Sequence, residues 1–279
     1  MQRSTIGVFD SGVGGLTVLK ELVSLLPNHS FIYFADTKNC PYGPKGTDEI
    51  VRLSKIITEF LISKGCSLIV VACNTATAAA IDHLRANYPI PFVGMEPAIK
   101  PAALNTKTKS IGVLATKGTF KGRLYQETSS KYAANINLCY KVGSGLVELV
   151  EQGESQSDKA KKLLKSYIAP MLQQNIDHIV LGCTHYPFFI PLLKEILPET
   201  VAIENPAPAV AQQALSLLSQ TAHPISNTNK TAQIPFTHLY ASGPITILKR
   251  LVSEIENATS TTFQNKSFLI FKKTDTRIL

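Results

Sequence analysis

The chain has 279 residues, of which 44% are hydrophobic and 17% charged, and its formal net charge is +8 at pH 7. These values are typical of a globular protein with room for two domains, and they exclude a disordered chain. No apolar run reaches the roughly 18–20 residues that a membrane-spanning helix needs, and the first residues lack the apolar region of a signal peptide. We therefore expect a soluble, cytoplasmic protein that does not bind a membrane.

The cysteines and the basic residues indicate which kinds of disulfide, metal and nucleic-acid site the chain lacks. The five cysteines, at positions 40, 66, 73, 139 and 183, include no C-x-x-C pair. Their odd number and spacing indicate free thiols in a reducing compartment rather than a disulfide framework or a zinc ribbon. The lysines follow amphipathic helices without the interleaved aromatic residues of RNA-binding segments, so we expect no nucleic-acid partner. The positive charge would attract a small anionic substrate.

The first hundred residues alternate between strand and helix patterns. Strands are expected at 5–10, at 31–35, in the apolar run that ends at Cys73, and at 92–94. Helical spacing predicts helices over 16–26, from Thr47 or Asp48 (as the capping residue) to Gly65, and over 76–87. The segment 36–46 holds two prolines and two glycines, which predict a loop.

The second part of the chain continues this alternation. Strands are expected at 110–114, 137–140, 178–181 and 201–203, and helices from about 120, over 146–152, over 157–174 and up to about 197. After these come a helix over 209–218, a polar loop over 219–230, a strand at 237–240, a helix after Pro244 and an apolar run at 268–271.

Two pairs of prolines divide the chain into domains. Pro97 and Pro101 mark a crossing out of the first domain, and Pro206 and Pro208 mark the return. We expect a discontinuous first domain of residues 1–97 and 207–279, and a second domain of residues 98–206. The alternation predicts an α/β fold, with a mainly parallel sheet flanked by helices in each domain.

A repeated pattern relates the two domains. Residues 68–75 read LIVVACNT and residues 179–185 read IVLGCTH, while the start of the first strand at Ile6 is matched at Ile111. Each copy places a cysteine at the carboxyl end of a buried strand, where open α/β sheets bind ligands. Although a repeat this degenerate also arises by chance, we take it as real. It predicts two pseudo-symmetric domains with the active site in the cleft between them.

Two thiols facing one cleft suit a particular reaction. One of them, as a thiolate, removes a proton from one face of a carbon, and the other returns a proton to the opposite face. The ordinary thiol pKa of about 8.5 keeps both protonation states accessible. Each cysteine alone is more simply a small buried hydrophobe. The matched positions of Cys73 and Cys183 favour the catalytic interpretation.

The segment Asp10–Gly15 reads DSGVGG and directly follows the first strand. It fits only two of the three glycine positions of a dinucleotide-binding loop, although Asp36 stands where a ribose-binding acid would lie. A nicotinamide enzyme is therefore one alternative. In another, Asp10 is an acid/base or amine-binding partner of the thiol, and Ser11 and the glycine N–H groups bind a carboxylate. A purely structural turn is the third.

Polar residues open the helices that follow both cysteines. They are Asn74, Thr75, Thr184 and His185. Exposed N–H groups and the positive end of a helix make such positions suitable for carboxylates. His185 could also control the proton of Cys183. The same pair could bind a metal, although no further ligands stand at recognisable spacing, or form a Cys–His hydrolase, which leaves Cys73 unexplained.

Two further features each have a simple interpretation beside a functional one. Tyr42 and Gly43 could supply another N–H group, or they belong to a plain turn. Glu151 is by default an exposed helix glutamate, and it could instead assist the chemistry.

These motifs together resemble the bacterial glutamate racemases. The resemblance rests on DSGVGGL from Asp10, Tyr42-Gly43, Cys73-Asn74-Thr75 and GCTHYP from Gly182, and it spans residues 5 to about 210. It implies a cofactor-independent isomerase that interconverts L-glutamate and D-glutamate, with two α/β domains around the substrate. The implied role is the supply of D-glutamate for peptidoglycan synthesis, and hence for cell-wall biogenesis and cell shape. The resemblance is compatible with a homodimer.

The resemblance also implies roles for individual residues. Cys73 and Cys183 would be the two proton donor/acceptors, with Asp10 and His185 as polar assistants. The implied substrate-binding residues are Asp10, Ser11, Tyr42, Gly43, Asn74, Thr75, Thr184 and His185, and no metal is implied. Family members often carry a Cys-Pro segment before the catalytic glutamate, which is absent here, so Glu148 rivals Glu151 as the assisting acid.

Two other functions remain open. A related racemase acting on aspartate would share both cysteines, and comparing the rates on the two substrates would separate the two enzymes. A non-catalytic protein with the same fold would bind glutamate without turnover.

Overall fold

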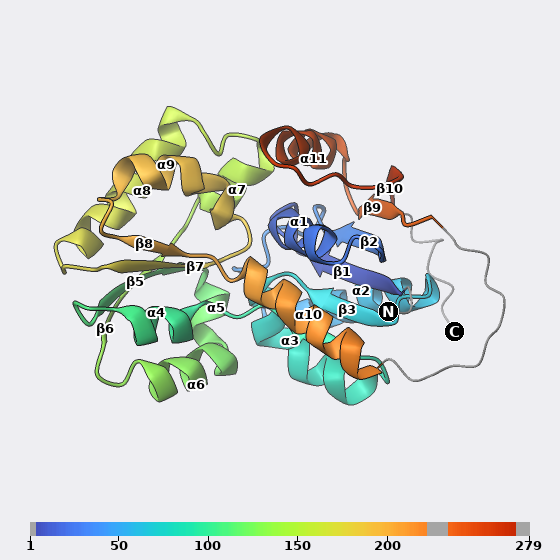
Figure 1. The fold of residues 1–279 in the computed structure, drawn as a ribbon, viewed down its shortest axis with the longest axis horizontal. Helices are drawn as coiled ribbons and strands as arrows, with labels where there is room; N and C mark the ends of the chain where they lie inside the picture. The colour runs from blue at the N-terminus through green and yellow to red at the C-terminus, as the bar shows by residue number, and fades with distance from the viewer. Residues whose placement is uncertain (1–3, 222–233, 272–279) are drawn as a thin grey trace.

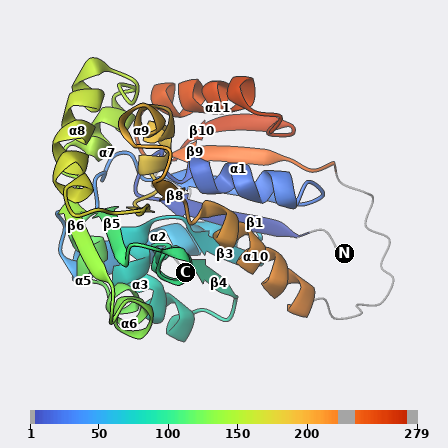
Figure 2. The same cartoon turned by 60° about the vertical axis from the view of Figure 1, so that its left-hand side comes forward.

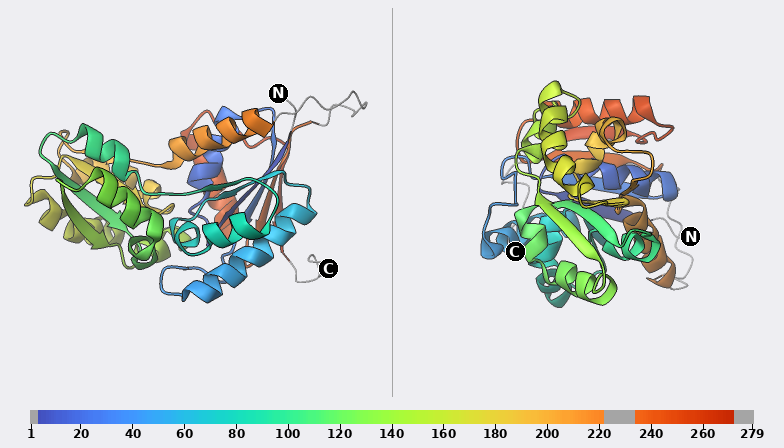
Figure 3. Two further views of the ribbon diagram at one scale, coloured as in Figure 1. Left: turned by 90° about the horizontal axis from the view of Figure 1, so that it is seen from below. Right: turned by 90° about the vertical axis from the view of Figure 1, so that its left-hand side faces the viewer.

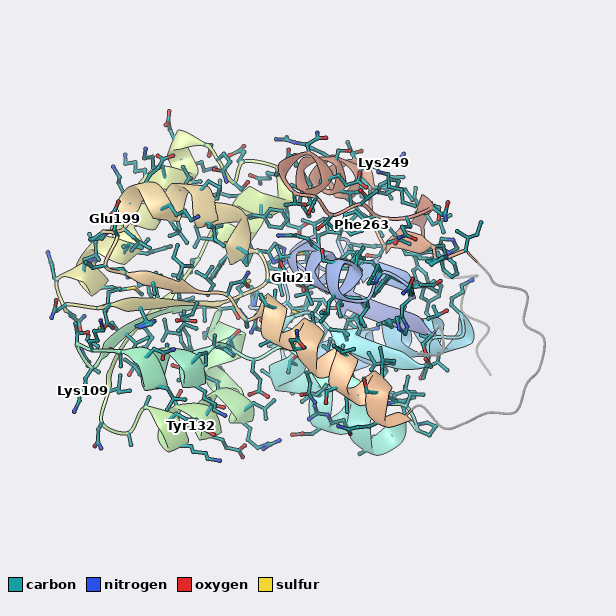
Figure 4. All side chains as sticks on the ribbon, in the orientation of Figure 1. Glu21, Lys109, Tyr132, Glu199, Lys249 and Phe263 are labelled. Atoms are coloured by element: carbon teal, nitrogen blue, oxygen red, sulfur yellow. The ribbon has the colours of Figure 1, made fainter. Side chains whose placement is uncertain are left out.

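The computed structural model describes residues 4–221 and 234–271, which form two lobes joined side by side (Figures 1 and 3). Lys109 and Glu199 lie at the outer end of the second lobe, far from the first (Figure 4). Among the described residues, no helix combines the length and apolar character needed to cross a bilayer. Most of the polar loop expected at 219–230 lies outside the described residues, and its first three residues belong to a helix.

The first lobe is built on a six-stranded parallel sheet with the strand order β10-β9-β2-β1-β3-β4. The strands are β1 (Thr5–Asp10), β2 (Ser30–Ala35), β3 (Leu68–Val71), β4 (Phe92–Gly94), β9 (Thr237–Ala241) and β10 (Lys266–Ile270). Its central strands are almost fully buried, which explains their continuous apolar runs.

Helices cover both faces of this sheet. One face packs against α1 (Leu16–Leu25), α10 (Ala207–Thr221) and α11 (Thr246–Ala258), and the other against α2 (Thr47–Ser63) and α3 (Asn74–Asn87). Phe263, in the turn after α11, is buried in the core of the first of these faces (Figure 4). The outer strands and α11 come from the end of the chain, so the carboxyl-terminal part completes the first lobe.

The second lobe contains a four-stranded parallel sheet with the order β6-β5-β7-β8. The strands are β5 (Ser110–Ala115), β6 (Asn137–Val142), β7 (His178–Gly182) and β8 (Ala202–Glu204). One face carries α4 (Ile99–Asn105), α5 (Lys117–Lys121) and α6 (Arg123–Tyr132). The other carries α7 (Leu146–Glu151), α8 (Asp158–Leu172), the 3-10 helix η1 (Tyr186–Phe189) and α9 (Ile190–Ile196). Figure 2 shows α8 and α9 on the opposite side of this lobe from α6.

The two sheets share one strand order, which confirms the predicted repeat. β2-β1-β3-β4 in the first lobe corresponds to β6-β5-β7-β8 in the second. From β1 the chain first adds β2 on one side and later β3 on the other, and it does the same around β5. Ligands of open α/β sheets bind beyond the strand ends where the direction of winding reverses. Both such points carry the predicted site residues.

Three predictions about helices were wrong. The helix α4 was missed because Pro97 and Pro101 indicated a linker, but Pro101 lies in the first turn, where a backbone N–H has no partner within the helix. Neither Thr47 nor Asp48 caps α2, which starts directly after Gly46 without a capping side chain. The helix expected from about residue 120 is split into α5 and α6 at Gly122.

The sheets also bear on the division into domains. The first sheet takes its strands from 5–94 and 237–270, and the second from 110–204. The helix α10 packs against α1 of the first lobe. These memberships support the proposed domains of 1–97 with 207–279, and of 98–206.

Asp177 joins the segments that lead into β5 and β7. Its carboxylate accepts hydrogen bonds from the Thr106 hydroxyl (2.6 Å) and from the backbone N–H groups of Lys107 (2.6 Å) and Thr108 (3.0 Å). Partial burial acts to raise the pKa of Asp177, but the hydrogen bonds outweigh it and lower the pKa to about 2. The ionised form therefore stabilises the second lobe.

Replacing Asp177 with alanine should lower the free energy of unfolding at pH 7 by about 1–2 kcal/mol, because three hydrogen bonds at a partly solvated site are lost. The unfolded side chain has a pKa of about 3.9. The stabilisation by Asp177 is therefore complete above about pH 4 and is lost as the pH falls through about 2. Chemical denaturation of both proteins at pH 7 and pH 3 measures this. Equal unfolding free energies at pH 7 would contradict the role given to Asp177.

Candidate active site

A cavity of about 600 Å³ lies between the lobes, at the carboxyl ends of both sheets. Four of its lining residues follow the central strands: Ser11 after β1, Cys73 after β3, Thr116 after β5 and Cys183 after β7. The structure thus brings both predicted thiols to the wall of a single cavity, one from each lobe. This placement follows from the shared strand order.

Cys73 lies at the N-terminus of α3. Its extended backbone lets the side chain cap the helix, and the N–H of Ala76 donates to its Sγ at 3.4 Å. The Sγ also lies 3.7 Å from the Ser11 Oγ. Burial and the nearby Asp10 carboxylate raise the pKa of the Cys73 thiol well above its ordinary value. The hydrogen bond at the helix terminus opposes this effect without cancelling it, so the surroundings of Cys73 favour the protonated thiol.

Cys183 lies at one end of a row of three interacting side chains, followed by His185 and Glu151. Its Sγ lies 3.8 Å from His185 Nδ1, and His185 Nε2 lies 2.7 Å from Glu151 Oε1. Burial acts to lower the pKa of His185, but hydrogen bonds to Cys183, Cys40 and Glu151 outweigh it and hold this pKa well above the ordinary value. The His185 ring thus places a positive charge beside the Cys183 sulfur. The two thiols therefore have different electrostatic surroundings.

The structure separates the two rival glutamates. Glu151, at the end of α7, pairs with His185 and also accepts a hydrogen bond from the N–H of Val13 at 2.7 Å. Glu148, one turn earlier, lines the cavity. Glu151 thus acts on the site through His185, whereas Glu148 is placed to meet a ligand directly.

Asp10 is fully buried behind the cavity wall. It lies next to Ser11, whose hydroxyl also contacts the Cys73 sulfur. Its Oδ2 accepts from the N–H of Gly15 at 2.8 Å, and its Oδ1 lies 3.4 Å from the Thr184 hydroxyl of the other lobe. Burial raises the pKa of Asp10, although the charge of His185 and the Gly15 hydrogen bond act against it. A carboxylate with a raised pKa is suited to exchanging protons.

The N–H groups of the DSGVGG segment do bind carboxylates, but these belong to the protein itself. Gly15 donates to Asp10, and Val13 donates to Glu151. The N–H of Gly15 is therefore already occupied, and the binding of a substrate carboxylate by the other glycine N–H groups stays a prediction. The hydrogen bonds position the two acids.

Close packing explains the glycines of this segment better than a nucleotide would. A Cβ at Gly12 would lie 1.9 Å from Glu151 Oε1, and one at Gly14 would lie 2.3 Å from His185 Nδ1. The side chains of Glu151 and His185, from the second lobe, fill the space directly beside these two glycines.

The Asp36 side chain is also committed elsewhere. The Tyr42 hydroxyl (2.6 Å), the Ser242 hydroxyl (2.6 Å) and the Asn39 amide all donate to its carboxylate. Asp36 is buried and fixes the loop that carries Tyr42 rather than offering an acid to a ribose. This arrangement counts against the nicotinamide alternative.

Seven of the eight expected substrate-binding residues line the cavity. They are Ser11, Tyr42, Gly43, Asn74, Thr75, Thr184 and His185, whereas Asp10 lies behind them. The Oδ1 of Asn74 is buried and has no hydrogen-bond partner among the described residues, which leaves it free to accept from an ammonium or N–H group of a ligand. The cavity therefore offers both acceptors and donors to a small zwitterion.

Comparison with known proteins identifies the family. The family model for Asp/Glu/hydantoin racemases matches residues 6–214. A glutamate racemase of Herpetosiphon aurantiacus is 48% identical over 219 residues, covering 78% of this chain and 86% of the relative. The chain belongs to the aspartate/glutamate racemase family. A glutamate racemase of Pseudomonas aeruginosa PAO1 is 43% identical, covering 80% of this chain and 84% of the relative.

Solved structures of family members have the same fold. The Escherichia coli glutamate racemase, in complex with L-glutamate and the activator UDP-MurNAc-Ala, matches with a TM-score of 0.81 and 31% identity, covering 97% of this chain and 98% of that one. The Francisella tularensis enzyme, in complex with D-glutamate, matches with a TM-score of 0.78 and 29% identity, covering 98% of both chains.

Thr116 also lines the cavity, and the sequence analysis did not identify it as a site residue. Its hydroxyl lies 2.8 Å from that of Thr75 in the other lobe and 2.8 Å from that of Thr119. A signal for it existed, because aligning the repeat places Thr116 opposite Ser11. The hydroxyls of Thr75 and Thr116 join the two lobes at the cavity wall.

Replacing Glu151 with glutamine should lower the pKa of His185 markedly, since a neutral amide cannot stabilise the imidazolium as a carboxylate does. NMR titration of the His185 ring nitrogens measures this directly and does not depend on any activity. Glu148→Gln is the matched control, three residues away on the same helix, and it should leave the His185 titration nearly unchanged. Equal shifts in the two variants would contradict the pairing described above.

Proposed function

We propose that this protein is a glutamate racemase that interconverts L-glutamate and D-glutamate without a cofactor. The observation that carries this proposal is the placement of Cys73 and Cys183 on one cavity, from matching strand ends of the two lobes. Several relatives at 43–48% identity are named glutamate racemase, and they span most of this chain. D-Glutamate is the product that would serve peptidoglycan synthesis and cell-wall biogenesis.

The reaction needs one thiolate and one thiol at the start of each turnover. The thiolate takes the α-proton of glutamate, and the thiol on the other side gives its own proton to the opposite face of the α-carbon. The thiolate thereby becomes a thiol and the thiol becomes a thiolate, so the enzyme is left ready for the reverse direction. Cysteine suits this exchange because both of its protonation states are accessible near neutral pH.

Each thiol has its own assistant in this proposal. Asp10 takes the proton that Cys73 must lose when Cys73 acts as the base, and its raised pKa brings it closer to the working pH. His185, charged and held by Glu151, stabilises the thiolate of Cys183. The two directions of racemisation therefore depend on different acids.

The cavity wall supplies the groups that would hold the substrate. Backbone N–H groups and hydroxyls at the start of α3, with Thr75, and at Thr184 would bind the carboxylates. Stabilising the α-carboxylate as negative charge develops on it lowers the barrier to removing the α-proton. Asn74 Oδ1 and Ser11 are placed to accept from the ammonium group. A homodimer stays a prediction.

Proton NMR of L-glutamate in deuterated water, with purified protein and no added cofactor, tests the proposal. We expect the Cα–H signal to disappear while D-glutamate forms, because the returned proton comes from a solvent-exchanged thiol. Cys73→Ser and Cys183→Ser should each lower the exchange rate by about 100-fold or more, since a serine hydroxyl is a far weaker base. The control Cys139→Ser removes a thiol from β6, away from the cavity, and should keep the wild-type rate.

The other outcomes identify the rival functions. Exchange of aspartate without exchange of glutamate would change the substrate and leave the mechanism. Binding of glutamate with no exchange of either amino acid would indicate a non-catalytic binding protein. Wild-type rates in Cys73→Ser would refute the two-thiol mechanism.

A further inference from the structure

Three potential metal ligands of different kinds meet beside the cavity. Cys40, Glu151 and His185 each offer one ligand atom, and these atoms all lie within 4.8 Å of one another. They come from the loop after β2, the end of α7 and the segment after β7. Cys40 is partly exposed and does not line the cavity, so its thiol takes no direct part in the proton transfers proposed above.

The DSGVGG segment forms the floor beneath these three side chains. A Cβ at Gly12 would lie 1.9 Å from Glu151 Oε1 and 2.9 Å from Cys40 Sγ, and one at Gly14 would lie 2.3 Å from His185 Nδ1. Glycine at both positions therefore provides the room in which the three groups approach. The N–H of Val13 fixes the Glu151 carboxylate in place.

We propose that Cys40, Glu151 and His185 form a binding site for Zn²⁺, and that the bound ion inhibits the enzyme. A thiolate, an imidazole and a carboxylate, with a fourth position left for water, make a suitable tetrahedral set for zinc. Mg²⁺ and Ca²⁺ prefer oxygen ligands throughout and are not expected here. The thiol is therefore the group that sets the selectivity of the site.

The spacing of the ligand atoms fits this ion with small adjustments. Bond lengths of about 2.0–2.3 Å place the ligands of a tetrahedral zinc about 3.4–3.6 Å apart. His185 Nε2 and Glu151 Oε1 are closer than this, at 2.7 Å, and the remaining separations are at most 4.8 Å. His185 is buried, so the adjustment falls to Cys40 and Glu151, which are partly exposed. Side-chain shifts of about 1 Å at these two residues bring all three atoms to zinc distances.

Binding exchanges two protons for the metal. Zn²⁺ forms bonds to Cys40 Sγ, His185 Nε2 and a Glu151 oxygen, and the thiol proton and the ring proton pass to solvent. The metal then replaces the hydrogen bond between His185 and Glu151. His185 keeps its Nδ1–H toward Cys183, but it loses its positive charge and is held by the metal. Its support for negative charge on the Cys183 sulfur is thereby weakened, which is the source of the inhibition. This second part rests on the proposed function, whereas metal binding itself does not.

Cobalt absorption spectroscopy tests the binding part without any assay of activity. Co²⁺ added to metal-free protein should give one equivalent of a tetrahedral spectrum with a thiolate charge-transfer band, and Zn²⁺ should displace it. In Cys40→Ser, which keeps a hydroxyl donor but lacks the soft ligand, the charge-transfer band should vanish and the Kd for Zn²⁺ should rise at least about 10-fold. Cys139→Ser is the matched control and should bind like the wild type.

The racemase assay tests the inhibition part. Zn²⁺ should inhibit the wild type and Cys139→Ser, a chelator should restore the rate, and Cys40→Ser should be active without metal and resistant to the ion. If Zn²⁺ inhibits Cys40→Ser as strongly as the wild type, the ion acts at Cys73 or Cys183 and the proposed inhibition is wrong. Absence of the charge-transfer band in the wild type would overturn the site itself. A Cys40-dependent band in a protein that exchanges neither amino acid would support the metal site and refute the racemase proposal instead.

Discussion

The carboxylate of Glu151 holds the two lobes in register at the base of the cavity. One of its oxygens accepts from Val13 of the first lobe and from His185 of the second, both at 2.7 Å. This shared oxygen requires the backbone of the first lobe to approach closely, which only glycine at position 12 permits. This contact holds the Nε2 side of the His185 ring, while Cys183 and Thr184 lie beside its Nδ1.

The two lobes repeat a backbone but not a chemical environment. Cys73 is buried at a helix terminus, near the carboxyl group of Asp10. Burial raises the pKa of both groups. Cys183 faces the imidazolium of His185 instead. A reaction that starts from either enantiomer needs each thiol in both protonation states. The two thiols reach these states beside different partners, Cys73 beside Asp10 and Ser11 and Cys183 beside His185.

The order of strands and helices could largely be predicted from the sequence, because buried parallel strands and amphipathic helices have strong periodic patterns. Both thiols could also be placed, since each directly follows such a strand. The choice between Glu148 and Glu151 could not be made, because residues three apart lie on the same side of a helix and only packing decides which one meets His185. The place of Cys40 beside Glu151 and His185 could not be predicted either, because these partners are more than 100 residues away in the sequence. Thr116 could have been found, because the repeat aligns it with Ser11.

The chain passes twice between the lobes, after β4 and again before α10, and these two elements pack against each other. Two covalent connections placed together would favour rotation of the lobes about one axis over sliding or twisting. Opening about such an axis would carry Cys73 with Ser11 and Asp10, and Cys183 with His185 and Glu151, as two intact halves. Substrate entry would then require breaking only the contacts that cross the cleft, such as those of Thr75 with Thr116 and of Val13 with Glu151. The catalytic groups of each half would remain assembled throughout the cycle.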